Sequence, residues 1–188
     1  ICEMIKENNF DIIWGGNARV DNIDLETLQM AKEAGCRQVT FGFESGSQRI
    51  LDVLNKRTTV EQNKRAIDLC NKLGIIPQGT FMIGNPTETI EDIRATQQFI
   101  KESDIESVGI CITTPYPGTE LWKWCEDRNL IPKSFDWCDF TYDRVAIHIC
   151  DSIPPKELER LWIQTVNIAC AKRPIKPFQF TSTSLTLE

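Results

Sequence analysis

Polar side chains suited to holding a charged ligand follow each of the buried segments that we expect to be strands. They are Arg19 after the first segment, Glu44 after the second, Asn85 and Glu88 after the third, and Thr113, Thr114 and Tyr116 after the fourth. The carboxyl ends of parallel strands meet at one edge of a sheet, so these residues should line one pocket. Arg19 can pair with a carboxylate through two hydrogen bonds, and Glu44 can accept from an ammonium group. The sequence therefore predicts a site for a ligand that carries both charges, such as an amino-acid group.

The elements that must position these residues alternate along the chain. Apolar periodicity and turn residues predict strands at 11–14, 37–43, 75–84 and 108–113. A loop is expected over 15–21, and helices are expected over about 24–34, 58–74, 90–101 and 120–128. Such alternation is typical of a parallel sheet with helical crossovers, so the predicted fold class is α/β.

The segment that follows Glu44 has the spacing of a helix capping box. Ser45 stands three residues before Gln48, an arrangement in which the two side chains satisfy backbone N–H groups of a first helical turn. We therefore expect Ser45 to begin a short helix.

The last third of the chain has a different character. Residues 130–150 carry aromatic side chains without a clear period, whereas Pro154 and Pro155 announce a helix that continues to about residue 172. The tail from residue 173 is expected to be loose, and Leu187 and Glu188 are interpreted as a vector remnant.

Composition excludes several classes of protein. The chain has 188 residues with a net charge of −6 and no basic stripe, which argues against a nucleic-acid partner. No apolar run approaches the ~20 residues that cross a bilayer. The eight cysteines form no C-x-x-C pair, and the one histidine, His148, lies in an apolar run. We expect no metal site, a structural histidine, and reduced thiols in the cytoplasm.

Five short motifs follow one another in an order that is specific when taken together. They are Arg19 after a Trp-bearing strand, Gly42-Phe43-Glu44-Ser45-Gly46-Ser47, Lys56 with Thr58-Thr59, the run from Gly79 to Thr89, and Pro115-Tyr116-Pro117-Gly118-Thr119-Glu120-Leu121. This order resembles the radical S-adenosylmethionine (radical SAM) superfamily, and most of all its cobalamin-binding branch. The resemblance implies an incomplete parallel (β/α) barrel, TIM-like, of about four units over residues 1–131. Residues 132–186 would be a carboxyl-terminal helical extension.

The resemblance also implies cofactors and a reaction for a longer protein. In the superfamily a 4Fe–4S cluster reduces S-adenosylmethionine to methionine and a 5′-deoxyadenosyl radical, which takes a hydrogen atom from the substrate. The branch further implies cobalamin, held by an amino-terminal domain that is not in this sequence. The substrate is expected to be an unknown small molecule.

Motif positions suggest which residues would hold S-adenosylmethionine. By this resemblance Glu44 lies near the methionyl amino group and the ribose, with Ser45 beside it, and Arg19 is a candidate partner for the methionyl carboxylate. Gly84 belongs to the motif that backs the adenine, and Pro117 and Gly118 match the turn on the adenine side. Glu88 falls one place later than the acid of the usual G-x-I-x-G-x-x-E pattern.

One family motif is missing from the sequence. The C-x-x-x-C-x-x-C loop that holds the cluster does not occur, so the resemblance implies a truncated barrel that begins within its second helix. No catalytic residue is assigned, and we expect the chain alone to be inactive. An unpaired strand at 11–14 would invite homodimerisation or aggregation.

Other interpretations of the same residues stand beside this one. Glu44 can instead cap the next helix or pair with Arg19, and Glu88 can be an acid placed at a helix start by the macrodipole. The whole chain can be a non-catalytic α/β module that binds a nucleotide or another small ligand. A metal-dependent hydrolase is weaker, because it needs clustered ligands.

Overall fold

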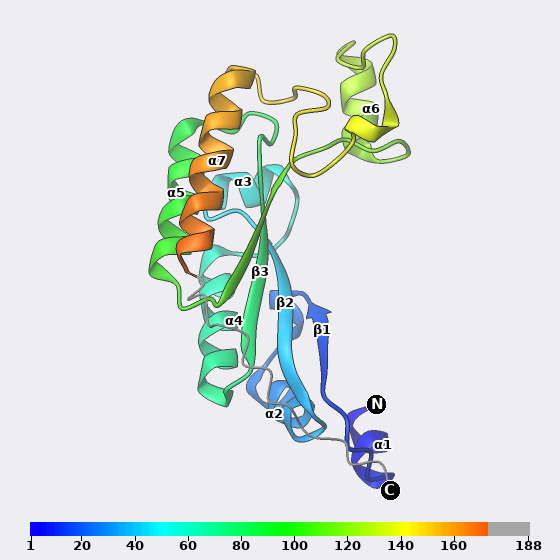
Figure 1. Ribbon diagram of the computed structural model, residues 1–188, viewed down its shortest axis with the longest axis vertical. Coiled ribbons are helices and arrows are strands. Elements are labelled where there is room, and N and C mark those ends of the chain that lie inside the picture. The colour runs from blue at the N-terminus through cyan, green and yellow to red at the C-terminus, as the bar shows by residue number, and fades with distance from the viewer. Residues whose placement is uncertain (173–188) are drawn as a thin grey trace, which may run out of the picture.

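Four parallel strands form the framework of the chain, whose computed structural model describes residues 1–172. The strands β1 (Trp14–Ala18), β2 (Cys36–Glu44), β3 (Ile76–Ile83) and β4 (Ser107–Ile112) make one sheet in the order β1-β2-β3-β4 (Figure 1). Every pair is parallel, which confirms the α/β class and the alternation of strands with helices. The helices are α1 (Cys2–Glu7), α2 (Leu25–Glu33), α3 (Gln48–Val53), α4 (Val60–Leu73), α5 (Ile90–Glu102), α6 (Glu120–Asp127) and α7 (Pro155–Ala171), with short 3-10 turns η1 (Val20–Asn22) and η2 (Trp137–Asp139).

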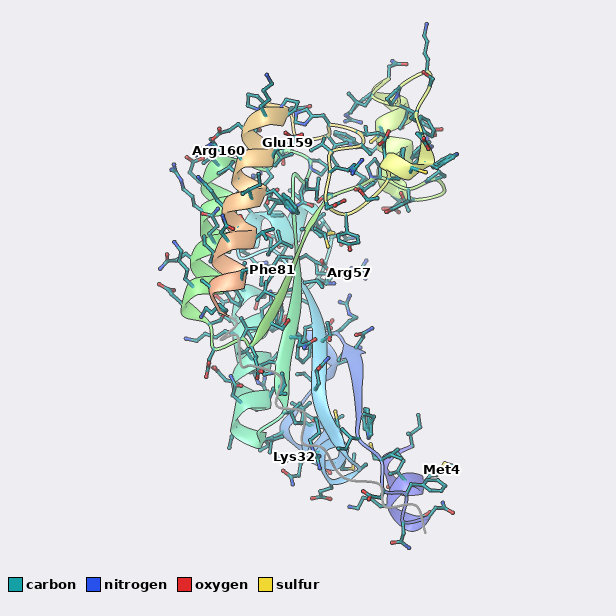
Figure 2. The ribbon with its side chains drawn as sticks, viewed as in Figure 1. Met4, Lys32, Arg57, Phe81, Glu159 and Arg160 are labelled. Atoms are coloured by element: carbon teal, nitrogen blue, oxygen red, sulfur yellow. The ribbon has the colours of Figure 1, made fainter. Side chains whose placement is uncertain are left out.

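The helices cover one face of the sheet and leave the other bare. Helices α2, α4, α5 and α7 lie along the same side of the strands (Figure 1). On β2 the alternate residues Val39, Phe41 and Phe43 are buried under these helices, whereas Gln38, Thr40 and Gly42 are only half-buried. Phe81 lies on the covered side and Arg57 on the uncovered side (Figure 2). Parallel sheets are normally buried on both faces, so a bare and polar face is a feature that requires an explanation.

A closely packed aromatic core fixes the covered face. The rings of Phe43 and Phe81 lie with centroids 5.6 Å apart, and Phe99 of α5 contacts both. A Cβ on Gly79 would lie 2.4 Å from the Phe43 ring, so only glycine fits beneath it. This core holds β2 and β3 in register and so sets where their carboxyl ends lie.

The first strand was predicted in the wrong place. The structure puts it at Trp14–Ala18, not at 11–14, and residues 11–13 are exposed. Gly15 and Gly16 resemble a loop in the sequence, yet β1 passes so close to β2 that a Cβ on Gly15 would lie 3.2 Å from the carbonyl oxygen of Gln38. Because β1 ends the sheet, self-association along this edge stays a prediction that size-exclusion chromatography can test.

The capping box predicted at Ser45 is also wrong. Helix α3 begins after Ser47, and the Ser47 side chain forms no capping hydrogen bond. The Ser45 hydroxyl is fully buried instead, where tertiary contacts with α5 replace the local cap. True capping boxes occur at Thr59 before α4 and at Thr89 before α5.

The carboxyl-terminal third has two parts. Helix α7 packs on β4 and α5, with the Trp162 indole donating to the carbonyl of Ile110 at 3.2 Å. Apolar residues between 121 and 149 form a second cluster around Cys125 and Phe140, which includes Trp122 and Trp124 of α6. The division at residue 131 stays a prediction, and the expected loose tail and vector remnant lie outside the described residues.

The eight cysteines are all free, and four of them, Cys36, Cys70, Cys125 and Cys150, are buried. Within residues 1–172 the structure has no helix of the length and apolar character needed to cross a membrane.

Candidate functional site

Glu44 occupies an unusual backbone conformation at the end of β2. Its φ is +62°, and the register with β3 shifts between Gly42 and Glu44, which marks a bulge. Such bulges re-aim a side chain at a strand end. The Glu44 carboxylate turns back over Gly42, where an added Cβ would lie 2.6 Å from Oε1. Glycine at position 42 therefore makes room for the acid on the bare face.

The partner of Glu44 is Lys56, which the sequence analysis did not assign to the site. Lys56 Nζ donates to Glu44 Oε1 at 2.6 Å, and the side chains are 19% and 16% exposed. The pairing of Glu44 with Arg19 that the sequence allowed is not formed. Lys56 lies in the loop after α3, so only its place in the motif order could have signalled this contact.

Arg19 joins the same group through the backbone of Lys56. Its Nε and Nη2 donate to the two carboxylate oxygens of Asp21 at 3.0 and 2.9 Å. Nη2 also donates to the carbonyl oxygen of Lys56 at 3.0 Å. The hydrogen bond from Arg19 holds the pKa of the Asp21 carboxyl below its usual value. The structure thus brings Arg19, Asp21, Glu44 and Lys56 together, and we call these four residues the charge cluster.

Ser45 is turned away from this cluster into the core. Its hydroxyl is hydrogen-bonded to Thr96 Oγ1 of α5 at 3.1 Å and accepts from the backbone N–H of Ser47 at 3.0 Å. A Cβ on the neighbouring Gly46 would lie 2.7 Å from the Cα of Thr96. The turn after Glu44 therefore packs closely against α5. The hydrogen bond of Ser45 to Thr96 fixes the backbone that follows Glu44.

Asp92 fastens this turn to the start of α5. It accepts from Ser47 Oγ at 2.6 Å and from the guanidinium of Arg49, and it also completes the capping box with Thr89. Burial opposes its charge, but the hydrogen bonds from Arg49, Ser47 and Thr89 hold the pKa of the Asp92 carboxyl far below its usual range. The loops that follow β2 and β3 are thereby joined.

Glu88 lies at the end of β3 and is completely buried. Its Oε2 accepts from the backbone N–H groups of Gly84 and Asn85 at 2.6 and 2.9 Å, and from Asn85 Nδ2 at 3.2 Å. Oε1 is buried without a hydrogen-bond partner among the described residues. Burial raises the pKa of this carboxyl to about 7, although the hydrogen bonds favour the charged form. The role of helix-start acid is wrong, because Glu88 precedes α5 and bonds back to the strand end.

The remaining predicted residues lie along the same edge in separate surroundings. Gly84 has a φ of +81°, and a Cβ there would lie 2.9 Å from Leu158 of α7. Asn85 accepts from Thr113 Oγ1 at 2.8 Å, which ties the ends of β3 and β4. Pro117 and Gly118 are exposed in the turn before α6, and Gly118 has a φ of +82° with open space around it.

No group of three or more histidine, cysteine or acidic side chains suited to a metal ion occurs within the described part of the chain. The buried Nδ1 of His148 has no hydrogen-bond partner there.

Comparisons with known proteins agree with the fold and with the resemblance to the radical SAM superfamily. The model of the Radical SAM superfamily matches residues 1–100. An uncharacterized methyltransferase from Pyrococcus horikoshii is 39% identical over 141 residues, which are 75% of this chain and 30% of that protein. The anaerobic magnesium-protoporphyrin IX monomethyl ester cyclase of Rubrivivax gelatinosus is 33% identical, over 68% of this chain and 23% of its own length. The chain thus spans less than a third of these relatives.

Solved structures share the architecture. The radical S-adenosylmethionine methyltransferase TsrM from Kitasatospora setae, determined with cobalamin and a 4Fe–4S cluster bound, superposes with a TM-score of 0.68 at 17% identity. The match covers 92% of this chain and 39% of that one. At this identity the likeness establishes the partial barrel fold.

Proposed function

Because this chain belongs to the radical SAM superfamily, which uses S-adenosylmethionine and a 4Fe–4S cluster, we propose that its charge cluster binds the amino-acid end of S-adenosylmethionine. The observation that carries the proposal is the Glu44–Lys56 pair, held over Gly42 on the bare face at the strand ends. Ligands of open α/β sheets bind outside the carboxyl ends of the strands.

The charges of the cluster fit a zwitterionic amino-acid group. The ligand ammonium would take the place that Lys56 Nζ now has beside the Glu44 carboxylate. The ligand carboxylate would lie between Lys56 and Arg19, two cations already connected through the Lys56 carbonyl oxygen. Each protein charge then exchanges a partner for another of the same sign, so neither is left unpaired on binding.

The other predicted residues have supporting roles in this proposal. The exposed Pro117 and Gly118 would form the adenine side, and the buried Gly84 would hold the end of β3 behind it. Ser45 holds the turn after Glu44 against α5 and need not touch the ligand.

The described residues do not fit the iron–sulfur cluster, because no suitable group of ligands occurs among them. In a longer protein the cluster would supply the electron that cleaves S-adenosylmethionine. This chain would bind and orient the cofactor, and we expect it to be inactive alone. From the names of its relatives, we propose methyl transfer with cobalamin for the longer protein, which should then retain cobalamin after anaerobic purification.

Calorimetric titration of the chain with S-adenosylmethionine tests the proposal. We expect Glu44→Gln to weaken binding by about 10- to 100-fold, the effect of losing a hydrogen bond to a charged group. Lys56→Met should weaken S-adenosylmethionine but not its decarboxylated analogue. Glu61→Gln, on the exposed first turn of α4, is the matched control and should bind as the wild type does. Equal affinities for Glu44→Gln and Glu61→Gln would refute the assignment.

A further inference from the structure

A cavity lies between two helices and the turn that follows β3. Its walls are Val53 and Leu54 at the end of α3, Pro86 in the turn after β3, and Leu121 and Trp124 of α6, with Glu120 at the rim. We call it the α3–α6 pocket. Its volume is about 260 Å³, below the roughly 300–1,000 Å³ of sites that enclose a whole ligand. The pocket therefore suits one end of a larger molecule.

Two wall residues of the pocket are near neighbours in sequence of the residues that bind Glu44 and Glu88. Leu54 stands two residues before Lys56 of the charge cluster, and Pro86 directly follows Asn85, which is bonded to Glu88. A molecule with one end in this cavity can thus extend toward the place proposed for S-adenosylmethionine. None of the hydrogen bonds described above for the charge cluster involves a wall residue, so the pocket is a separate feature.

The walls of the pocket are apolar and its rim carries one charge. Trp124 is held in place by Arg128, whose guanidinium carbon lies 4.1 Å from the ring centroid and whose Nη1 donates to the Trp124 carbonyl at 3.4 Å. The Glu120 carboxylate has no ion-pair or hydrogen-bond partner within residues 1–172. An apolar cavity with a free carboxylate at its mouth is complementary to an apolar group that bears a positive charge.

We propose that the α3–α6 pocket binds the apolar, positively charged end of the substrate, a ring or branched alkyl group that carries an ammonium. The inference rests on the proposed function, because a substrate must lie next to the site that holds S-adenosylmethionine. Burial of the apolar group against Leu121 and Trp124 would supply most of the affinity. Glu120 would select for the cation.

Three small probes that share a phenylethyl group and differ in charge test the inference: phenethylammonium, 2-phenylethanol and 3-phenylpropionate. Their binding is followed through the indole N–H signals of the ¹⁵N-labelled chain, with the Trp124 signal assigned from Trp124→Phe. Phenethylammonium should shift the Trp124 signal in a saturable way. Its affinity should be the highest of the three, followed by that of the alcohol and then that of the carboxylate. The signals of Trp14 and Trp162, which donate to Ala34 and Ile110, should not move.

Variants separate the apolar wall from the charge. Glu120→Gln should remove the preference for the ammonium over the alcohol, a change of about two- to fivefold for an exposed charge pair. Val53→Lys should weaken phenethylammonium binding by a similar or larger factor, since it adds a like charge at a half-exposed wall position. Ile163→Lys, at an exposed apolar position on α7, is the control and should leave binding unchanged.

The outcomes distinguish this inference from the proposed function. A Trp124 signal that does not shift, or equal affinity for the ammonium and carboxylate probes, overturns the pocket even if S-adenosylmethionine binds. Selective ammonium binding without S-adenosylmethionine binding supports the pocket and removes the proposed function.

Discussion

Two glutamates stand at the ends of neighbouring strands and have opposite environments. Glu44 ends β2 on the bare face and pairs with the ammonium of Lys56, whereas Glu88 follows β3 and is buried on backbone N–H groups. The partner of the first acid is a side-chain ammonium, which in our proposal the ligand ammonium replaces. The second interacts with the chain itself. An acid at a strand end is therefore a functional candidate only when its partner can be exchanged.

Glu88→Leu tests the structural half of this comparison and should have the largest effect. The substitution leaves the buried N–H groups of Gly84 and Asn85 without an acceptor, so we expect the free energy of unfolding to fall by about 3–5 kcal/mol. Urea denaturation at pH 7 measures the change. Glu91→Leu, an exposed acid in the first turn of α5, should change it by less than about 0.5 kcal/mol. A small effect of Glu88→Leu would show that water or a shift of the backbone provides other acceptors for the N–H groups of Gly84 and Asn85.

The pH dependence of stability should carry the signature of Glu88. Its pKa rises from the ordinary 4.5 to about 7 on folding, so the folded chain holds this proton more tightly than the unfolded chain. The resulting stabilisation is complete below pH 4.5 and is lost as the pH rises to about 7, a difference of roughly 3 kcal/mol. Asp92, whose pKa is lowered, acts in the opposite direction and only as the pH falls below its ordinary 3.8. Urea midpoints between pH 4.5 and 8 should therefore fall in the wild type more steeply than in Glu88→Gln. If the urea midpoints of the wild type and of Glu88→Gln changed in parallel with pH, the raised pKa of Glu88 would be contradicted.

Much of this edge could be predicted from local sequence, and the errors have physical causes. The helix starts predicted near residues 24, 58 and 90 lie within one residue of the observed N-caps Asp24, Thr59 and Thr89, because capping is a contact between near neighbours. The partners of Glu44 and Ser45 were not predicted, since Lys56 and Thr96 reach them only through the tertiary fold.

The misplaced first strand illustrates the same limit. Gly15 suits a loop by its own preferences, and only the close approach of β2 makes a small residue fit a strand there. Position along the chain thus identified the sheet edge that holds the candidate site. Which side chains pair along that edge is decided by tertiary packing, which local sequence does not reveal.

Gly42→Ala sharpens the functional half of the comparison. The new Cβ would lie 2.6 Å from Glu44 Oε1 and 3.2 Å from Lys56 Nζ, so the pair must separate or move. We expect S-adenosylmethionine binding to weaken about tenfold with a stability loss of only about 1 kcal/mol. Gly109→Ala is matched, because its Cβ on the same bare face would meet Thr80 at an ordinary 3.5 Å. Equal binding by both variants would mean that the observed position of Glu44 is not the one used.

Glu44→Gly should have the smallest effect on the free energy of unfolding among the variants of the two acids. A small effect would distinguish a ligand-binding acid from a structural one. Glycine relieves the left-handed φ of +62°, a gain of about 1 kcal/mol, which offsets part of the lost and mostly shielded pair with Lys56, worth about 2 kcal/mol. The free energy of unfolding should then stay within about 1 kcal/mol of the wild type while S-adenosylmethionine binding is lost. A loss above about 3 kcal/mol would place Glu44 with Glu88 as a structural acid. If the chain with glycine at position 44 is nearly as stable as the wild type, the fold does not need the acid, and ligand binding is the role left for Glu44.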